Sequence, residues 1–164
     1  LQGRQRLDGA AMNPLTIYQN ALNIVSEAVL AGDFFRYAAM IDFPYLVHTA
    51  DADLLVTTTA DLLPAFEAVH RGLTSRGVTH YERVARSADY VDRNRIEGRH
   101  HTHMLADGLP VNCAHASGQT IVRRGELWLF SEAHYDAVKG DRWPLTFSNL
   151  FDAADALGLP EAAK

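Results

Sequence analysis

Cysteine is almost missing from this sequence, because Cys113 is the only one among 164 residues. An intrachain disulfide is therefore excluded, and the composition fits a reducing compartment, so we expect a cytoplasmic protein. A lone cysteine in a predicted strand is most often a small buried apolar residue. The alternative is a nucleophilic thiol with His100 or His115 as its neighbour.

The sequence also lacks a basic run and a long apolar run. The net charge is −5, which disfavours nucleic acid as a partner. No stretch approaches the roughly 20 apolar residues that cross a bilayer, so no membrane partner is expected. With 48% hydrophobic and 21% charged residues, the composition is that of one globular domain. We place this domain at residues 12–164, after a disordered or non-native leader at 1–11 and with a C-terminal extension at 141–164.

Capping and turn signals divide the chain into a helical first half and a strand-rich second half. Pro14 and Gly32 bound the first predicted helix, and Asp33 caps a short second helix. A third helix is predicted to end at Gly77. Strands and their turns account for most of the rest. The predicted strands are a hairpin at 45–49 and 54–58, followed by 79–91, 95–105, 111–123 and 126–138.

Two turn signals in the second half predict which residues of the strands face each other. Asp107-Gly108 and Arg124-Gly125 are each interpreted as a two-residue loop. This register sets His100 opposite His115, and His115 opposite His134, so three histidines form a row on one face of the sheet. One bulge would move part of this row to the other face.

The face that carries this row combines polar and aromatic side chains, as a small-molecule pocket requires. We expect it to bind a small apolar or carbonyl-containing ligand. The same face is predicted to carry Thr102, Cys113, Ser117, Gln119, Glu132 and Asp136, beside Met104, Ile121, Trp128 and Phe130. From the first half of the chain, Tyr18, Tyr37, Tyr45 and His48 are expected to cover the pocket.

Acid–base chemistry is one interpretation of this pocket. His115 and His134 are candidate general bases, because neighbouring imidazoles depress one another's protonation. Asp136 or Glu132 is the candidate carboxylate that orients the imidazole or stabilises its protonated form. The competing interpretation is a hydrogen-bonded core network, or a polar dimer face, without catalysis.

A histidine metal site is a weaker alternative. His101 and His103 share one face of their strand, and such a pair can chelate zinc. However, the sequence has no cysteine pair, and His100 is separated from these two histidines by the sheet. We therefore expect no bound structural metal and no cofactor.

The order of the elements resembles the nuclear transport factor 2-like superfamily, and within it the SnoaL-like group, named for a polyketide cyclase. The segments that carry the likeness are 31–35, 62–77 and 125–136. The resemblance implies an α+β fold in which a curved, mostly antiparallel sheet wraps around three helices as a cystatin-like cone with a pocket. Proteins of this shape include cofactor-independent cyclases, isomerases and dehydratases, while others bind ligands without chemistry.

The resemblance also implies frequent homodimers, and the last strand supports one. Trp128 and Phe130 are expected on one face of this strand, and Leu127, Leu129 and Ala133 on the other. Helices cover only one face of a single sheet, so the other face is left for a second subunit. The C-terminal extension, through Trp143, Leu150 and Phe151, is the competing cover within one chain.

Overall fold

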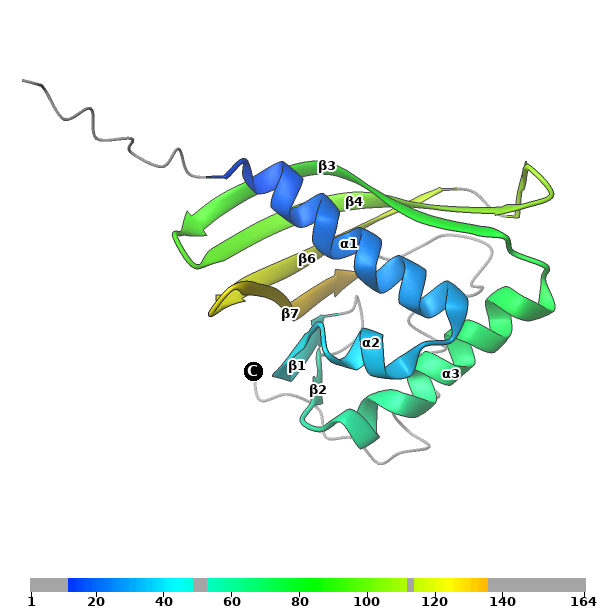
Figure 1. Ribbon diagram of the computed structural model, residues 1–164, viewed down its shortest axis with the longest axis horizontal. Helices are drawn as coiled ribbons and strands as arrows, with labels where there is room; N and C mark the ends of the chain where they lie inside the picture. Colours follow the sequence, from blue (N-terminus) through cyan, green and yellow to red (C-terminus); the bar gives the residue numbers. More distant parts are fainter. Residues whose placement is uncertain (1–11, 49–52, 112–113, 136–164) are drawn as a thin grey trace, which may run out of the picture.

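The computed structural model describes residues 12–48, 53–111 and 114–135. They form an α+β fold in which a curved, mixed sheet of seven strands has its helices on one side (Figure 1). This arrangement confirms the predicted fold class. The predicted C-terminal helix, Cys113 and Asp136 lie outside the described residues. Within the described part of the chain, no helix has both the length and the hydropathy needed to cross a bilayer.

Helix α1 has the bounds that its capping residues predict. It spans Pro14–Ala31, with Asn13 accepting a hydrogen bond from the backbone of Leu15 at its start. Gly32 ends it with φ of 73°, a conformation that side chains disfavour. Two further helices are α2, Phe34–Ala38, and α3, Thr59–Ser75. Thr58 and Asp61 form a reciprocal capping box at the start of α3.

The sheet joins the predicted hairpin to the predicted meander. Its strands are β1 Ile41–His48, β2 Asp53–Val56, β3 His80–Asp92, β4 Arg95–Ala106, β5 Leu109–Pro110, β6 His115–Arg124 and β7 Leu127–Tyr135. The spatial order is β2-β1-β7-β6-β4-β3, and β5 pairs with β4. The pairing of β1 with β7 is parallel, whereas the other strand pairs are antiparallel. We call the face toward α1 the inner face and the opposite one the outer face.

The register between β4 and β6 differs from the prediction by two residues. The Asp107-Gly108 turn forms as predicted, with Ala106 opposite Leu109. The pairing of β4 with β6 is offset from the predicted one by two residues, so Thr102 lies opposite His115 and His100 lies opposite Ser117. A shift of two preserves the faces, because side chains alternate with a period of two.

The register between β6 and β7 overturns the predicted histidine row. The turn is Gly125-Glu126, one residue later than predicted. Further along, the register shifts because Ser131 is an extra residue that forms a bulge in β7. Beyond this bulge, His134 lies opposite Gly118 and belongs to the outer face. His115 and His134 therefore lie on opposite faces, and the prediction of a common row is wrong.

The same bulge changes the argument for a homodimer. Ala133 was expected on the outer face, but it lies on the inner face and is fully buried. The outer face of β7 instead presents Glu132 and His134 beside Leu129. The homodimer stays a prediction, and the face proposed for it is more polar than expected.

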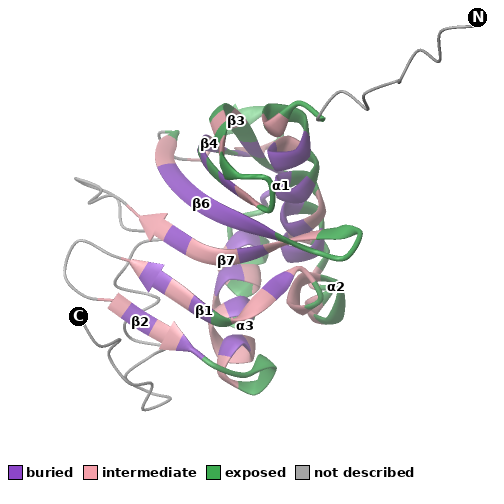
Figure 2. Ribbon diagram, turned by 90° about the vertical axis from the view of Figure 1, so that its left-hand side faces the viewer, coloured by how far each residue is buried: buried purple, intermediate pink, exposed green. Residues whose placement is uncertain are grey.

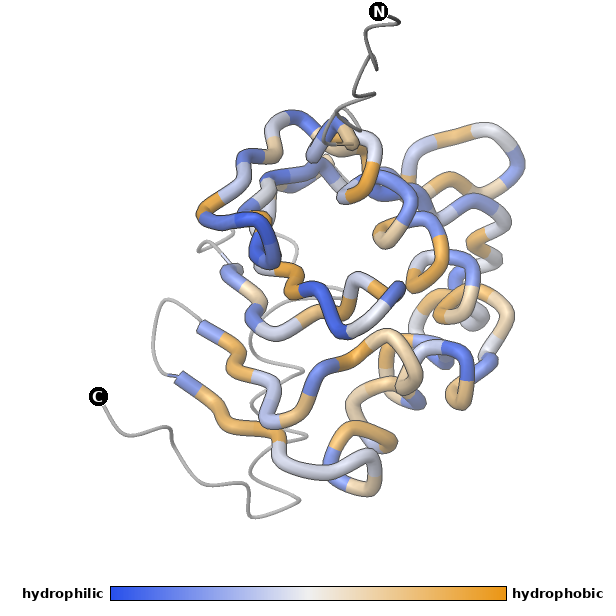
Figure 3. Tube along the Cα trace, turned by 60° about the vertical axis from the view of Figure 1, so that its left-hand side comes forward, coloured by the Kyte–Doolittle hydropathy of each residue, from blue (hydrophilic) through white to orange (hydrophobic). Residues whose placement is uncertain are grey.

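Packing of α1 on the inner face forms the main core. Tyr18 and Leu22 of α1 are fully buried against Ile96, Ile121 and Phe130 of the sheet. Figure 2 shows β6 buried along most of its length, and Figure 3 shows hydrophobic and hydrophilic stretches intermixed along the chain. A second cluster, formed by Val29, Phe66, Val69, Leu73, Val78, Tyr81 and Met104, packs around α3.

Candidate functional site

Buried polar side chains gather on the inner face, next to α1. Tyr18 and His100 share a hydrogen bond of 2.8 Å between the phenol oxygen and Nδ1. Burial lowers the pKa of His100 to about 3 and raises the pKa of Tyr18. His100 is therefore neutral near pH 7, and with so low a pKa it is a weak general base.

We call Tyr18, Tyr81, Arg83 and His100 the inner cluster, to which Arg83 of β3 contributes a positive charge. Its guanidinium donates to the Tyr81 hydroxyl, at 2.7 Å from Nη2 and 3.2 Å from Nε. Within residues 12–48, 53–111 and 114–135, no carboxylate forms an ion pair with Arg83. Burial raises the pKa of Tyr37 and Tyr135, and the charge of Arg83 opposes that rise. The inner cluster thus combines a buried cation with neutral hydroxyl groups.

The structure places most of the predicted pocket residues on this face. Tyr45 donates to Gln119 Oε1 at 3.1 Å, and Ser117 is buried beside them. Tyr37 packs on Phe66, with ring centroids 5.1 Å apart. The half-buried His115 and the fully buried Phe130 also belong to the inner face. Their roles in binding or catalysis stay predictions.

A cavity of about 670 Å³ opens between the first half of α1 and the turns at the end of the sheet. We call it the α1 cavity. Tyr90 and Trp128 stand in its wall with ring centroids 6.3 Å apart, so one predicted ligand residue, Trp128, lines it. The lining residues are Met12, Ile17, Asn20, Ala21, Ile24, Met40, Tyr90, Arg93, Arg123, Glu126, Leu127 and Trp128. The wall is mainly apolar, with charged groups among its members.

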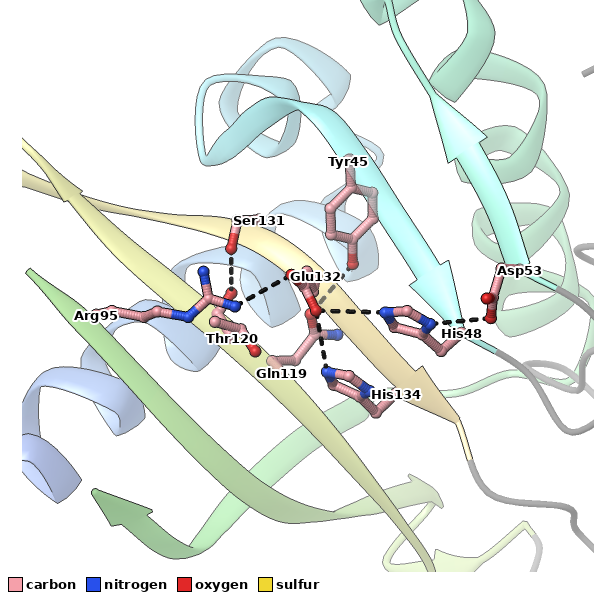
Figure 4. A network of polar contacts seen from close by, with 9 residues as sticks. All are labelled: Tyr45, His48, Asp53, Arg95, Gln119, Thr120, Ser131, Glu132 and His134. Atoms are coloured by element: carbon pink, nitrogen blue, oxygen red, sulfur yellow. Dashed lines mark hydrogen bonds and ion pairs between the residues drawn. The ribbon is translucent and has the colours of Figure 1, made fainter. Parts of the chain in front are cut away.

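A histidine–carboxylate group lies on the outer face (Figure 4). We call it the outer-face cluster; its members are His48, Asp53, Arg95, Glu132 and His134. The parallel pairing of β1 with β7 sets His48 opposite His134, and their rings stack at 4.6 Å. Glu132 Oε2 lies 3.3 Å from His48 Nε2 and 3.5 Å from His134 Nε2. Asp53 Oδ1 is 2.9 Å from His48 Nδ1, and Arg95 Nη2 is 3.1 Å from Glu132 Oε1.

The charges of the outer-face cluster shift its pKa values. Partial burial acts to raise the pKa of Glu132, but hydrogen bonds from Arg95 and His48 outweigh it and hold this pKa below its ordinary value. Burial and the charge of His48 lower the pKa of His134, and the negative charge of Glu132 offsets only part of that decrease. Glu132 is therefore a carboxylate near neutral pH.

This geometry corrects three of the predicted pocket residues. Glu132, His134 and His48 were expected in one pocket with His115, yet they lie on the outer face. The bulge at Ser131 moves Glu132 and His134, and the parallel β1–β7 pairing moves His48 beside them. Turn signals between neighbouring strands contain no information about that pairing, because β1 and β7 are far apart in the sequence.

A second hollow, of about 380 Å³, adjoins the outer-face cluster at His134. The residues that line it include Gly118, Thr120, Glu97 and Arg99. The Thr120 hydroxyl is buried and has no hydrogen-bond partner among the residues described. Both chemical features of the outer face, the cluster and the hollow, were absent from the sequence-based prediction.

Comparison with solved structures identifies the fold. An NTF2-like protein of unknown function from Shewanella oneidensis gives a TM-score of 0.59 at 9% identity, over 76% of this chain and 100% of that one. A protein of unknown function from Mycobacterium tuberculosis gives 0.58 at 11% identity, over 92% and 93%. An NTF2-like protein with a cystatin-like fold from Novosphingobium aromaticivorans gives 0.56 at 15% identity, over 78% and 84%. The chain has the NTF2-like fold.

The sequence itself matches no family model and none of the curated proteins with which it was compared. At identities of 9–15%, the NTF2-like neighbours show a shared fold and nothing about shared chemistry. Function therefore has to be argued from the cavity and from the side chains around it.

Proposed function

We propose that this NTF2-like protein binds a small, largely apolar organic molecule in the α1 cavity. The proposal rests on a single observation, a cavity of about 670 Å³ that is lined mainly by apolar side chains. Ligand sites commonly have volumes of roughly 300–1,000 Å³ and are lined by apolar and aromatic groups with a few polar ones. Trp128 and Tyr90 supply the aromatic surface here.

The polar groups of the wall suggest what the ligand carries. Arg93 and Arg123 are exposed at the cavity, and the Nε of Arg123 donates to the Gly125 carbonyl at 3.0 Å. Two guanidinium groups favour a carbonyl or carboxylate at one end of an otherwise apolar molecule. Glu126 lines the same wall and would repel a ligand carboxylate placed close to it.

Cofactor-independent acid–base catalysis of the SnoaL-like type is the second candidate function. It is supported by the likeness in fold to a protein from Streptomyces avermitilis that is provisionally named a dehydratase of the NTF2-like family. The described histidine–carboxylate pairs lie on the outer face, and the Tyr18–His100 pair is buried away from the α1 cavity, so ligand binding is the function that the geometry supports better.

The test is calorimetric titration with 2-naphthoate, 2-naphthaldehyde and naphthalene as probes of an apolar body with and without a polar group. We expect saturable binding, with naphthalene the weakest. Ile24→Trp fills the cavity from α1, and Thr16→Trp places the same indole on an exposed position of the same helix as the control. Binding should weaken at least tenfold in Ile24→Trp alone. Equal binding by both folded variants, or none by the wild type, would contradict the proposal.

A further inference from the structure

We propose that His48, Glu132 and His134 bind a divalent first-row transition-metal ion on the outer face. The ligand atoms that these residues offer all lie within 4.8 Å of one another. Two imidazoles and one carboxylate are an established ligand set for zinc and for non-haem iron. This site lies on the face of the sheet opposite the α1 cavity, so the inference is independent of the proposed function.

The spacing of the ligand atoms fits a metal ion. At metal–ligand distances of about 2.0–2.1 Å, two ligand atoms at a tetrahedral angle are about 3.3–3.4 Å apart. Glu132 Oε2 lies 3.3 Å from His48 Nε2 and 3.5 Å from His134 Nε2. Charge-assisted hydrogen bonds between nitrogen and oxygen are shorter, at about 2.7–2.9 Å. The distances therefore match two edges of a coordination tetrahedron better than they match two strong hydrogen bonds.

The third edge joins the two histidines. Their rings are nearly parallel, with an interplanar angle of 9° and centroids 4.6 Å apart. Binding an ion requires the two Nε2 lone pairs to converge, so the rings must tilt toward each other. Both side chains are partly exposed, at 30% for His48 and 41% for His134, which leaves them free to adjust.

Asp53 and Arg95 orient two of the three ligands, His48 and Glu132. Asp53 Oδ1 contacts His48 Nδ1 at 2.9 Å, which leaves Nε2 as the coordinating nitrogen. A carboxylate on the far nitrogen is the usual companion of a metal-binding histidine, since it fixes the tautomer and raises the basicity of the ligand. Arg95 engages Glu132 Oε1 at 3.1 Å, and so leaves Oε2 for the ion (Figure 4).

The local charge also favours a cation. With neutral imidazoles, Glu132 and Asp53 contribute −1 each and Arg95 contributes +1, so the formal sum is −1. Three protein ligands leave at least one further position for water or another small ligand. The adjoining hollow of about 380 Å³ gives access at His134, and Thr120, whose buried hydroxyl has no partner among the described residues, is one of the residues that line it.

The competing interpretation is an ion network in which Asp53 and Glu132 hold a protonated His48. A third possibility is that zinc binds His101 and His103, which share the outer face of β4. Variants distinguish these two interpretations from the proposed metal site. His48→Gln, Glu132→Gln and His134→Gln each remove one proposed ligand, Asp53→Asn weakens the support of His48, and His103→Gln is the matched control on the same face.

The experiment titrates ZnCl₂ into tag-free, chelator-stripped protein by calorimetry, with Mg²⁺ as a second arm. We expect one Zn²⁺ per chain and no Mg²⁺ binding, because imidazole suits transition metals and Mg²⁺ requires oxygen ligands. Each ligand variant should lose at least tenfold in affinity, Asp53→Asn should lose about 10–100-fold, and His103→Gln should match the wild type. Thermal melts of metal-free variants check that each one is folded.

Three results would overturn the proposal: no zinc binding by the wild type, undiminished binding by the folded ligand variants, or loss of binding in His103→Gln. A spectrum of the wild type with Co²⁺ gives a readout that needs no variant. Low-coordinate nitrogen and oxygen ligation predicts ligand-field bands in the visible range without a thiolate charge-transfer band. A thiolate band would assign the ion to Cys113 and would exclude the outer-face cluster.

Discussion

Replacing Tyr18 by phenylalanine tests the inner cluster at its most buried hydrogen bond. Tyr18 is 0% exposed and His100 is 2% exposed, and 2.8 Å separates the phenol oxygen from Nδ1. The substitution keeps the ring and removes only the hydroxyl, so His100 Nδ1 loses this partner in a site that water does not reach. Leaving a buried polar group without its partner costs about 1–3 kcal/mol. We therefore expect Tyr18→Phe to lower the free energy of unfolding by that amount.

Tyr90→Phe is the matched control for this prediction. The Tyr90 hydroxyl donates to the Met12 carbonyl at 2.8 Å, but this contact is exposed and water can replace it. We expect a change within about 0.5 kcal/mol for the control. Urea unfolding followed by circular dichroism measures both variants. Equal effects of the two substitutions, or no effect of Tyr18→Phe, would refute the claim that the Tyr18–His100 bond is a buried structural contact.

Three further predictions concern other features. Burial depresses the pKa of His100 to about 3 from 6.5, so its contribution to stability is fully present above pH 6.5 and is lost as the pH falls toward 3, at up to about 1.4 kcal/mol per pH unit. The free energy of unfolding of His100→Asn should therefore depend less steeply on pH across this range, and an unchanged slope would refute the assignment. A Cβ on Gly98 would lie 2.5 Å from Tyr18 Cε1, so Gly98→Ala should lower the free energy of unfolding by about 1–3 kcal/mol. Tyr18→Leu in the same chain should reduce this loss, and effects of the two substitutions that simply add in urea unfolding would argue against the clash. The homodimer predicts twice the monomer mass of 18.1 kDa in light scattering at micromolar concentration, and a monomer mass would remove it.

Local signals in the sequence were sufficient for much of the fold. Pro14 and Gly32 set the bounds of α1, because each suits only one end of a helix. The Asp107-Gly108 turn formed where predicted, since both residues adopt positive φ values, 51° and 77°. Two of the predicted pocket residues, His100 and Ser117, were placed on the inner face by strand alternation.

The rest depended on a β-bulge and on a long-range strand pairing, and neither has a local signal in the sequence. Ser131 forms a bulge, yet serine is not a distinctive bulge residue, and a single extra residue exchanges the faces of everything beyond it. The outer-face cluster needed this bulge together with a parallel pairing between strands about 85 residues apart, which brings His48 to His134. The expectation of no bound metal rested on the absence of a cysteine pair and on the split of His100 from His101 and His103, and none of these residues belongs to the cluster that we propose binds an ion.

Ligand binding in the α1 cavity is the central claim, and the indole of Trp128 reports on it directly. The measurement is a titration of ¹⁵N-labelled protein with 2-naphthoate, followed by proton–nitrogen correlation spectra. The account predicts saturable shifts of the Trp128 indole and of the amides of Ile17 and Ala21, which line the cavity, while the amides of His48 and His134 on the outer face stay unchanged. Shifts confined to the outer face, or no saturable shift at Trp128, would contradict it.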